Sequence, residues 1–500
     1  MGKPLAKILE RVTPVDGALG ALVVGGLSAD SRTVRPGDLF VALRGDHADG
    51  HAFLSAAARS GAVAALVERD ISPAPLPCVR VPSTFSALPA VAAAFYEDPS
   101  ARLTVIGVTG TNGKTTVTYL LESILSAAGQ RALVIGSIDY RLGGEVLRTG
   151  LTTPFPHELQ SVMARGLSMG ATHVVMEVSS HAAAQGRIAG VRFRAGAFTN
   201  LTHDHLDYHG DMESYFRAKA RFFREVLPAG ETGADMAVNG DDPYGRRLVR
   251  EFPDAILFGS AKENAVRPES VDLSPDGIRM SVVTPGGDLS VSSRLVGAHN
   301  VSNILAAAAV AHLLGIPRDA VERGIRDLAL VPGRVERIPN RRGIRIYVDY
   351  AHTPDGLDRV LSGLRELTPG RLISVFGCGG NRDRTKRPEM GQAAARRSDL
   401  VLVTSDNPRN EDPLAIIAEI LPGVVSEGFV RGDGSTADAA RIFEVIPDRR
   451  SAIERALDIA RPGDSVVIAG KGHEHVQIIG DRSLPFDDRE AVRAVLARDG

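Results

Sequence analysis

The sequence predicts an α/β protein of three domains, in which helices cover mostly parallel sheets. Short β-branched runs alternate with helical patterns along the whole chain, and this alternation is typical of parallel sheets. The length of 500 residues suggests about three domains. Two polar stretches that contain proline, 96–103 and 330–343, divide the chain. We therefore expect domains over residues 1–100, 101–331 and 332–500.

Strands and helices are predicted most clearly in the second and third segments. A buried strand is expected over 103–110, followed by a helix over 115–129, and a second strand over 172–178. Three more strands are expected over 371–377, 399–405 and 464–470. Ligands of parallel sheets bind beyond the carboxyl ends of the strands, so the residues that follow each strand are the candidates for function.

Composition excludes several classes of protein. The net charge is -2 and no basic footprint is present, so no nucleic acid is expected as a partner. The two cysteines, Cys78 and Cys378, lie far apart without a metal-binding pattern, which fits a reduced, cytoplasmic location. The first residues lack the apolar core of a signal peptide, and no apolar run is long enough to span a bilayer. We expect no membrane partner.

A glycine-rich loop follows the first central strand, with the sequence GVTGTNGKTT over residues 107–116. Glycines let backbone N–H groups point at phosphate oxygens, and the helix that follows adds the positive end of its dipole. Lys114 would reach the terminal phosphates and Thr115 would bind Mg²⁺. Val108 stands where the strict pattern has glycine. The predicted nucleotide-binding residues are Gly110, Thr111, Asn112, Gly113, Lys114, Thr115 and Thr116. The alternative is a plain glycine turn.

Histidines and carboxylates gather after the next strands. Glu177 ends the strand THVVME, and the segment 199–210 reads TNLTHDHLDYHG. A zinc hydrolase is one interpretation, but its motif needs histidine directly after Asp207, where this chain has Tyr208. The phosphate loop favours Mg²⁺, bound by one imidazole and several oxygens. The alternative is a surface histidine loop. Lys219 lies in an amphipathic stretch, where a lysine is ordinarily a solvated charge.

Many motifs together resemble the Mur ligase family, whose members use ATP to add amino acids to the peptidoglycan precursor. The resemblance covers nearly the whole chain, and it is greatest to the members that add meso-diaminopimelate. The motifs are DSRTVRPGDLFVALRG, GVTGTNGKTT, EVSSH, TNLTHDHLDYHG, YFRAKA, GAHNVSNILAA, VPGRVERI, VDYAHTPDGL, FGCGGNRDRTKRP, SDNPRNEDP and AGKGHE.

This resemblance implies the fold, the reaction and the partners. The first domain would bind the uridine nucleotide. The second would contain a P-loop ATPase-type sheet and bind ATP, and the third would be Rossmann-like and bind the incoming amino acid. The reaction would join meso-diaminopimelate to the D-glutamate γ-carboxylate of UDP-MurNAc-L-Ala-D-Glu, with ATP and Mg²⁺ as cofactors. The resemblance places the chain in peptidoglycan synthesis, and hence in cell wall biogenesis, cell shape, cell division and the cell cycle. A monomer is expected.

The same resemblance assigns individual residues. The muramoyl-dipeptide site would contain Ser31, Asp46, His47, Ala48, Thr152, Thr153, Ser179, Gln185 and Arg187. Adenine and ribose would be bound by Asn300, Arg334 and Asp349. The diaminopimelate pocket would contain Arg382, Asp406, Asn407, Pro408, Arg409, Gly470 and Glu474. The catalytic and metal-binding group would contain Lys114, Thr115, Glu177, His205 and Lys219, the last as a CO₂-derived carbamate. The chain departs from the family pattern at His47, often glutamine, and at Leu151, where a relative has asparagine.

Four alternatives remain at this point. An L-lysine-adding Mur ligase differs only in the pocket that reads the distal carboxylate. Folylpolyglutamate synthase shares the phosphate loop but lacks a uridine-binding domain, which DSRTVRPGDLF favours here. A P-loop switch or motor would hydrolyse ATP without an amino acid. A non-catalytic nucleotide-binding module would not need so many polar residues after the strands.

Overall fold

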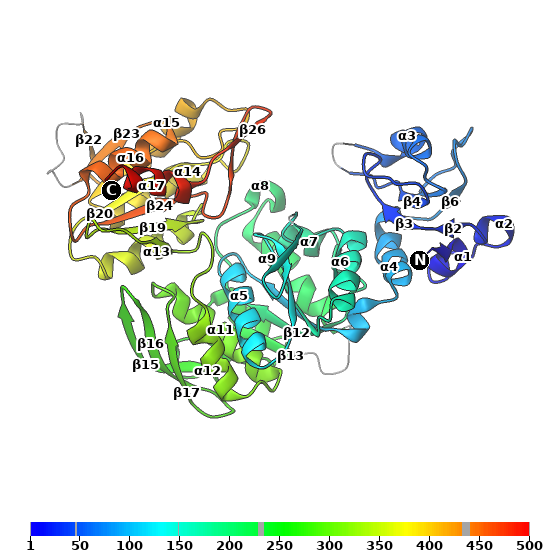
Figure 1. Cartoon of the computed structure of the whole chain (residues 1–500), viewed down its shortest axis with the longest axis horizontal. Helices are drawn as coiled ribbons and strands as arrows, with labels where there is room; N and C mark the ends of the chain where they lie inside the picture. Colours follow the sequence, from blue (N-terminus) through cyan, green and yellow to red (C-terminus); the bar gives the residue numbers. More distant parts are fainter. Residues whose placement is uncertain (1, 46–47, 149, 229–234, 433–440, 500) are drawn as a thin grey trace. The chain divides into compact units, whose positions relative to one another are not determined.

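The computed structural model describes residues 2–45, 48–148, 150–228, 235–432 and 441–499 (Figure 1). Two compact units are distinguished: residues 1–109, 129–197 and 218–236 form one, and residues 110–128, 198–217 and 237–500 form the other. Parallel strands alternate with helices in both, so the predicted α/β class is confirmed.

The N-terminal part of the first unit is a parallel sheet in the order β3-β4-β5-β6. Neighbouring residues of β4 face opposite sides of this sheet, as the two-residue period of a strand requires. Leu39 and Val41 pack in one core with α1 (Leu5–Leu9) and α4 (Thr84–Tyr96), whereas Phe40 packs in a second core with α3 (Leu54–Arg59). The elements are α1 (Leu5–Leu9), β3 (Gly26–Ser28), β4 (Asp38–Val41), α3 (Leu54–Arg59), β5 (Ala64–Val67), β6 (Cys78–Arg80) and α4 (Thr84–Tyr96).

The largest sheet has the order β10-β9-β8-β11-β7-β12-β13-β14. Its strands β7 (Thr104–Thr109) and β11 (His173–Glu177) pair in parallel, with Glu177 opposite Val108. Both predicted central strands are therefore confirmed, and Glu177 lies at the carboxyl edge of the sheet. The other strands are β8 (Ala132–Ile135), β9 (Tyr140–Leu142), β10 (Glu145–Arg148), β12 (Phe193–Phe198), β13 (Asp235–Asn239) and β14 (Ile256–Phe258).

Helix α5 (Lys114–Ala127) begins directly after the glycine-rich loop, as predicted. Gly129, with φ +76°, follows its end in the left-handed conformation typical of a helix C-terminus. The remaining elements before the third predicted domain are α6 (Pro156–Ser168), α7 (Ser180–Ala184), α8 (Leu206–His209), α9 (Met212–Arg221), α10 (Pro243–Val249), β15 (Arg267–Ser274), β16 (Gly277–Val283), β17 (Leu289–Ser293), α11 (His299–Leu313) and α12 (Arg318–Asp327).

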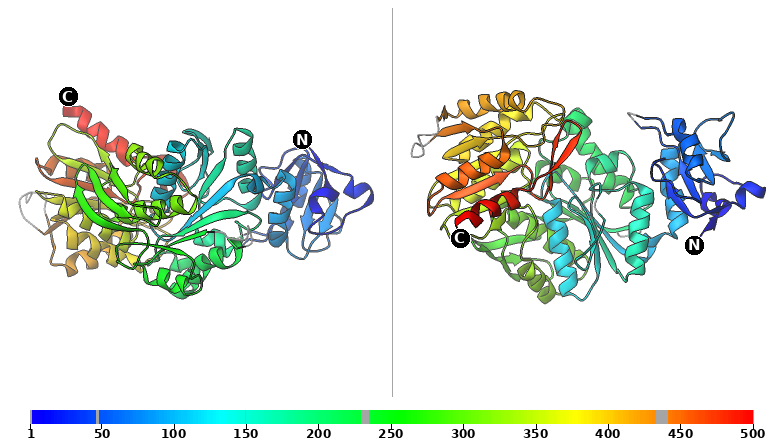
Figure 2. Two further views of the ribbon diagram at one scale, coloured as in Figure 1. Left: turned by 90° about the horizontal axis from the view of Figure 1, so that it is seen from below. Right: turned by 45° about the horizontal axis from the view of Figure 1, so that its top comes forward.

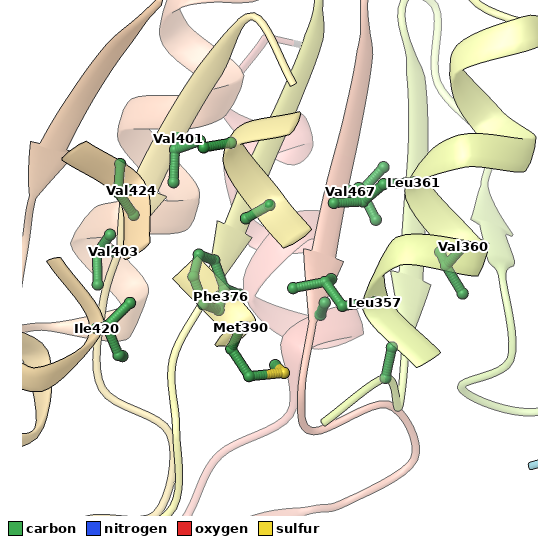
Figure 3. Packing of buried hydrophobic residues seen from close by; sticks show 14 of the residues in the cluster. Leu357, Val360, Leu361, Phe376, Met390, Val401, Val403, Ile420, Val424 and Val467 are labelled. Atoms are coloured by element: carbon green, nitrogen blue, oxygen red, sulfur yellow. The ribbon is translucent and has the colours of Figure 1, made fainter. Parts of the chain in front are cut away.

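The C-terminal part of the second unit is a sheet in the order β18-β19-β24-β20-β21-β23-β22, with helices on both faces (Figure 2). Val467 of β24 packs toward α13 and α14, and its neighbour Val466 packs toward α16 and α17. Figure 3 shows Phe376 beside Met390, and Val401 and Val403 on the side of Val424 and Ile420. The predicted strands correspond to β20 (Leu372–Phe376), β21 (Leu400–Val403) and β24 (Ser465–Ala469), which are confirmed.

The other elements of this part are β18 (Glu336–Ile338), β19 (Arg345–Asp349), α13 (Pro354–Glu366), α14 (Lys386–Arg397), α15 (Pro413–Ser426), β22 (Val430–Arg431), β23 (Ile442–Val445), α16 (Arg449–Ile459), β25 (Val476–Ile479), β26 (Arg482–Pro485) and α17 (Asp488–Leu496). Across the described ranges, no helix combines the length and the apolar character that crossing a membrane would require.

Candidate active site

The phosphate loop has the backbone that its glycines allow. Gly110 and Gly113 have φ values of +146° and +88°, which residues with a side chain rarely adopt. A Cβ atom on Gly113 would lie 2.3 Å from Oδ1 of Asn303, and one on Gly110 would lie 1.9 Å from Oγ1 of Thr199. Neither position has room for a side chain, so the glycines are needed for both conformation and packing.

The segment 199–202 holds this loop from the side. Thr111 N donates to Asn200 O at 2.9 Å, and Asn112 N donates to Asn200 Oδ1 at 2.9 Å. Thr199 Oγ1 donates to Asn112 O at 2.6 Å, and Thr202 N donates to Thr111 Oγ1 at 3.0 Å. These bonds hold the loop through contacts within the protein itself, and such preorganisation is what electrostatic catalysis requires.

Lys114 lies over the loop itself. Its ammonium donates to Gly110 O at 2.9 Å and to Thr111 O at 2.8 Å. The next residue, Thr115, accepts a hydrogen bond from Arg334 Nη2 at 3.1 Å. The structure thus brings the predicted phosphate-binding lysine, the predicted Mg²⁺-binding hydroxyl and one predicted ribose-site residue together.

The other adenosine-site candidates lie close to the same loop. Asn300 Oδ1 accepts from Asn303 Nδ2 at 2.9 Å, and Asn303 is the residue that abuts Gly113. Asp349 is buried and accepts from the backbone N–H groups of Val335 and Ala351, both at 2.7 Å. Burial raises the pKa of Asp349, although these hydrogen bonds and the charge of Arg334 act to lower it.

A second polar cluster in the first unit gathers five residues of the predicted muramoyl site. Thr153 Oγ1 donates to Glu177 O at 2.8 Å and accepts from Ser179 N at 3.0 Å. Arg187 donates to Thr153 O at 3.1 Å and to Gln185 Oε1 at 2.8 Å. Thr152 completes the cluster through a 3.1 Å hydrogen bond with Ser137.

Two residues predicted for the uridine part, Asp46 and His47, lie outside the described residues. Ser31 is partly buried in the turn that precedes β4, and Ala48 is exposed. Leu151, the departure from the family pattern, has an exposed side chain. Nothing in the structure explains that departure.

Glu177 is buried, and both of its carboxylate oxygens accept from Ser137, from N at 2.9 Å and from Oγ at 3.0 Å. Lys219 on α9 is only 1% exposed. The interpretation of this lysine as an ordinary solvated charge is therefore wrong. The helix is amphipathic, but Lys219 belongs to its buried face.

His205 lies in the loop before α8, with 42% of its side chain exposed and Nε2 3.3 Å from Asp204 Oδ2. Burial opposes ionisation of Asp204, but the charges of His205, His352 and Lys386 outweigh it and lower its pKa to about 2. His203 contacts a different carboxylate, with Nε2 3.1 Å from Asp383 Oδ2.

The described residues contain no group of three or more His, Cys, Asp or Glu side chains able to hold a metal ion. Mg²⁺ needs fewer protein ligands than zinc, because it keeps several waters and prefers oxygen. The Thr115 hydroxyl and the Glu177 carboxylate are donors of the kind that Mg²⁺ takes. Lys219 would become such a donor only as a carbamate.

The predicted diaminopimelate residues lie around the ends of β21 and β24. Asn407 Nδ2 donates to Glu474 Oε2 at 2.9 Å, and a Cβ atom on Gly470 would lie 2.4 Å from Asp406 Oδ2. Pro408 is buried, and Arg409 follows it in a left-handed conformation with φ +52°. The Arg409 guanidinium donates to Gly380 O at 2.8 Å. Burial and the nearby charge of Arg382 lower the pKa of Arg409.

Sequence reasoning missed several residues that hold these clusters. They are Asn200, Asn303, Ser137, Lys471 and Tyr350, whose ring centroid lies 4.4 Å from Cζ of Arg334. Lys471 is fully buried and donates to Asn407 Oδ1 at 3.0 Å and to Glu474 Oε2 at 2.9 Å. Four of these residues lie inside the motifs quoted above: Asn200, Asn303, Tyr350 and Lys471. A polar residue in the middle of a motif could therefore have indicated a residue of the site. Ser137 lies outside every motif.

Comparisons with known proteins show which family the chain is similar to. Three family models match: the Mur ligase family catalytic domain over residues 23–101, the Mur ligase middle domain over 108–311, and the Mur ligase glutamate ligase domain over 333–472. A Geobacter metallireducens protein named UDP-N-acetylmuramoyl-L-alanyl-D-glutamate--2,6-diaminopimelate ligase is 49% identical over 95% of this chain and 94% of its own. A Geobacter sulfurreducens protein of the same name is 47% identical over 95% of each chain.

Solved structures extend the comparison. A structure titled as UDP-N-acetylmuramoyl-L-alanyl-D-glutamate--2,6-diaminopimelate ligase has a TM-score of 0.68 and 32% identity, covering 100% of this chain and 99% of its own. A Mycobacterium tuberculosis folylpolyglutamate synthase shares the fold, with a TM-score of 0.63 and 19% identity over 82% of this chain and 95% of its own. By the match of all three domain models and of relatives over nearly its full length, the chain belongs to the Mur ligase family.

Proposed function

We propose that this chain is an ATP-dependent ligase that joins meso-diaminopimelate to the D-glutamate γ-carboxylate of UDP-MurNAc-L-Ala-D-Glu. The products are the tripeptide precursor of peptidoglycan, ADP and phosphate. Relatives that are 42–49% identical over nearly the whole chain carry this activity in their names. The observation that carries the proposal is the Lys114 loop, preorganised by segment 199–202, in a chain that also presents the Asp406–Arg409 cluster.

The chemistry explains why ATP is needed. A carboxylate does not react with an amine near neutral pH, because its carbonyl is a poor electrophile. The γ-phosphorus of ATP forms a bond to the carboxylate oxygen while its bond to the β-phosphate oxygen breaks. The amine then attacks the carbonyl carbon of the acyl phosphate, the C–O bond to phosphate breaks, and the amine loses a proton. The first step brings two anions together, and the second develops negative charge on the tetrahedral intermediate and the departing phosphate. Charge neutralisation by Lys114 is therefore the main contribution of the loop.

Mg²⁺ and a modified lysine are part of the proposal. When bound, Mg²⁺ supplies further neutralisation of the phosphate charges. We assign Thr115, Glu177, His205 and a carbamate on Lys219 as the residues that hold or position it. Burial of Lys219 supports the carbamate, since an ammonium at 1% exposure is costly, whereas a carbamate supplies anionic oxygens for a cation.

The proposal divides the work among three domains with boundaries 1–100, 101–331 and 332–500, which bind the uridine nucleotide, ATP and the amino acid. The muramoyl peptide is assigned to the cluster of Thr152, Thr153, Ser179, Gln185 and Arg187. The protein would act as a cytoplasmic monomer. Its two cysteines are free thiols, which supports a reducing compartment.

The test is phosphate release by the purified protein with ATP, Mg²⁺, UDP-MurNAc-L-Ala-D-Glu and a panel of amino acids. We expect release only when both the muramoyl dipeptide and meso-diaminopimelate are present. Phosphate release without an amino acid would indicate a P-loop switch or motor instead. A preference for L-lysine would indicate the lysine-adding type, which the names of the relatives do not favour.

A further inference from the structure

Lys386 is a buried lysine that the mechanism above does not use. It is the first residue of α14 and is only 7% exposed. Within the described part of the chain, its ammonium has neither a hydrogen-bond acceptor nor an ion-pair partner. Its neighbour Arg387 is also buried, but it is paired with Glu411 at 2.9 Å and Glu419 at 2.7 Å. Its charge acts on the carboxylate of Asp204, but no acceptor contacts the ammonium directly, so its N–H donors can still bind an arriving anion.

The helix N-terminus adds to this positive charge. Helix α14 has 12 residues, and its N-cap residue, Thr385, makes no side-chain hydrogen bond to the first turn. The first N–H groups of a helix carry partial positive charge and accept anions. Lys386 and the helix end therefore favour the same kind of ligand. The helix end alone would not identify a site, but Lys386 beside it, only 7% exposed and without a direct partner for its ammonium, is an independent observation.

Two connections lead from Lys386 to the phosphate loop. Segment 199–202 holds that loop, and His203, the next residue, lies 3.1 Å from Asp383, three residues before Lys386. The second connection runs through the segment that follows β19. Asp355 accepts from Asn112 Nδ2 of the phosphate loop at 3.0 Å. The pKa of His352, in the same segment, is lowered by burial and by the charge of Lys386, so Lys386 is close enough to act on this histidine.

The carboxylate whose pKa the charge of Lys386 lowers, Asp204, already has other partners. Asp204 Oδ2 lies 3.3 Å from His205 Nε2 and 3.9 Å from His352 Nε2. The amino-acid cluster is also complete without Lys386. Its internal bonds join Asn407, Glu474 and Lys471. None of these three bonds includes Lys386, whereas the two connections described above lead from its surroundings to the phosphate loop.

We propose that Lys386 is a catalytic residue that binds the phosphoryl group during its transfer from ATP to the substrate carboxylate. It then keeps hold of that group as the phosphate that leaves when the amine attacks. Phosphorus exchanges its bond to the ADP oxygen for one to the carboxylate oxygen, and the later break of the carbon–oxygen bond yields inorganic phosphate. Lys386 neutralises charge in both steps and transfers no proton. This inference rests on the proposed ligase activity.

The test compares native protein with Lys386→Met and Lys386→Arg in single-turnover rapid quench. ATP, Mg²⁺ and the UDP-muramoyl dipeptide are mixed without amino acid, and the ADP formed with the acyl phosphate is measured. We expect the rate to fall at least ~10²-fold in Lys386→Met, with partial recovery in Lys386→Arg, which restores the charge. The inhibition constant for inorganic phosphate should rise about tenfold, whereas the KM for diaminopimelate should stay within about twofold.

The control is Lys262→Met, a lysine on an exposed turn, which should behave as native protein in every assay. Thermal melting establishes that each variant is folded, and Lys386→Gln replaces Lys386→Met if the latter does not fold. A native rate of acyl phosphate formation in a folded charge-neutral variant would overturn the inference. A change confined to the KM for diaminopimelate would also overturn it, by moving the lysine to the amino-acid site. If native protein forms no ADP with the dipeptide, the proposed function fails first.

Discussion

Buried charge is the feature that distinguishes this molecule at the scale of residues. Lysine is among the residue types least often buried, yet Lys219, Lys386 and Lys471 are each less than a tenth exposed among the described residues. Lys471 has two partners in the amino-acid cluster. Each buried lysine lies in one of the motifs that carry the family resemblance, so these three lysines are the ones to test for a role in the reaction.

The phosphate loop gives the first residue-scale prediction. Lys114→Ala should lower ligation by at least ~10³-fold, because the ammonium that neutralises the terminal phosphates is lost. Two of its hydrogen bonds go to backbone carbonyls of its own loop, so their loss should leave the fold intact. Ligation is measured as phosphate release and folding as the melting temperature. Lys262→Ala is the control, and near-native turnover of folded Lys114→Ala would remove the central claim.

Lys219 gives the second prediction. Lys219→Ala should be nearly inactive because the carbamate oxygens are lost, and a short carboxylic acid should partly restore activity by replacing them. The assay is phosphate release with increasing acetate, compared with the same series on Lys114→Ala, which acetate should not rescue. Mass spectrometry of native protein under bicarbonate provides a second measurement. Full activity of Lys219→Ala would contradict the assignment.

Arg409 gives the third prediction, on amino-acid choice. A guanidinium matches a carboxylate with two parallel hydrogen bonds, and L-lysine has no distal carboxylate to offer. The native protein should prefer meso-diaminopimelate over L-lysine by about 10²-fold or more in kcat/KM. Arg409→Ala should lose most of that preference. An unchanged preference in this variant would show that Arg409 does not read the distal carboxylate.

At the scale of elements, one ion pair joins the N-termini of two helices on the same face of the C-terminal sheet. Arg449, the first residue of α16, and Asp488, the first residue of α17, both have fully buried side chains, with Nη2 and Oδ2 2.7 Å apart. Arg449 also donates to Ala469 O at the end of β24 at 2.9 Å. This pair fixes the helix ends beside the strand that leads to Gly470.

Breaking that pair should destabilise the C-terminal part strongly. Asp488→Ala leaves the Arg449 charge buried without a partner, which costs about 3–5 kcal/mol in the free energy of unfolding. The control is Asp30→Ala, whose partner Arg32 is 86% exposed, so the loss should be at most ~1 kcal/mol. Calorimetry and denaturant unfolding report both values. Equal losses in the two variants would contradict the argument from burial.

At the scale of the whole molecule, separate ligands should stabilise separate parts. A chain with several cores is not expected to unfold in one two-state step. ADP with Mg²⁺ at ~100 times its Kd should add about 2.7 kcal/mol to the stability of the part that binds it. In calorimetry, ADP should raise the transition that contains the phosphate loop, and Lys114→Ala should reduce this rise. UDP alone should raise a different transition, and a single common shift by both ligands would contradict separate sites.

The sequence alone determined the class of fold, the central strands and the phosphate loop, because these depend on local patterns. Short apolar runs that alternate with helical patterns predicted β7, β11, β20, β21 and β24. The loop GVTGTNGKTT could be recognised because its backbone needs glycine at two positions with positive φ. The family resemblance added the reaction and the names of the site residues. The burial of Lys219 could not be predicted from the sequence around it. An amphipathic helix has a buried and an exposed face, and the sequence did not show that this lysine lies on the buried one.

Which residues lie in contact depends on the tertiary structure. Asn200 lies 88 residues from Asn112, and Asp355 lies 243 residues from it, yet both bind its loop. Such contacts depend on how strands and loops are packed, which no local period encodes. The same holds for Lys386, whose sequence position beside an ion-paired arginine gives no sign that its charge lacks a partner. Hydrogen bonding and burial are properties of the assembled fold, and that is where the unpaired charge becomes visible.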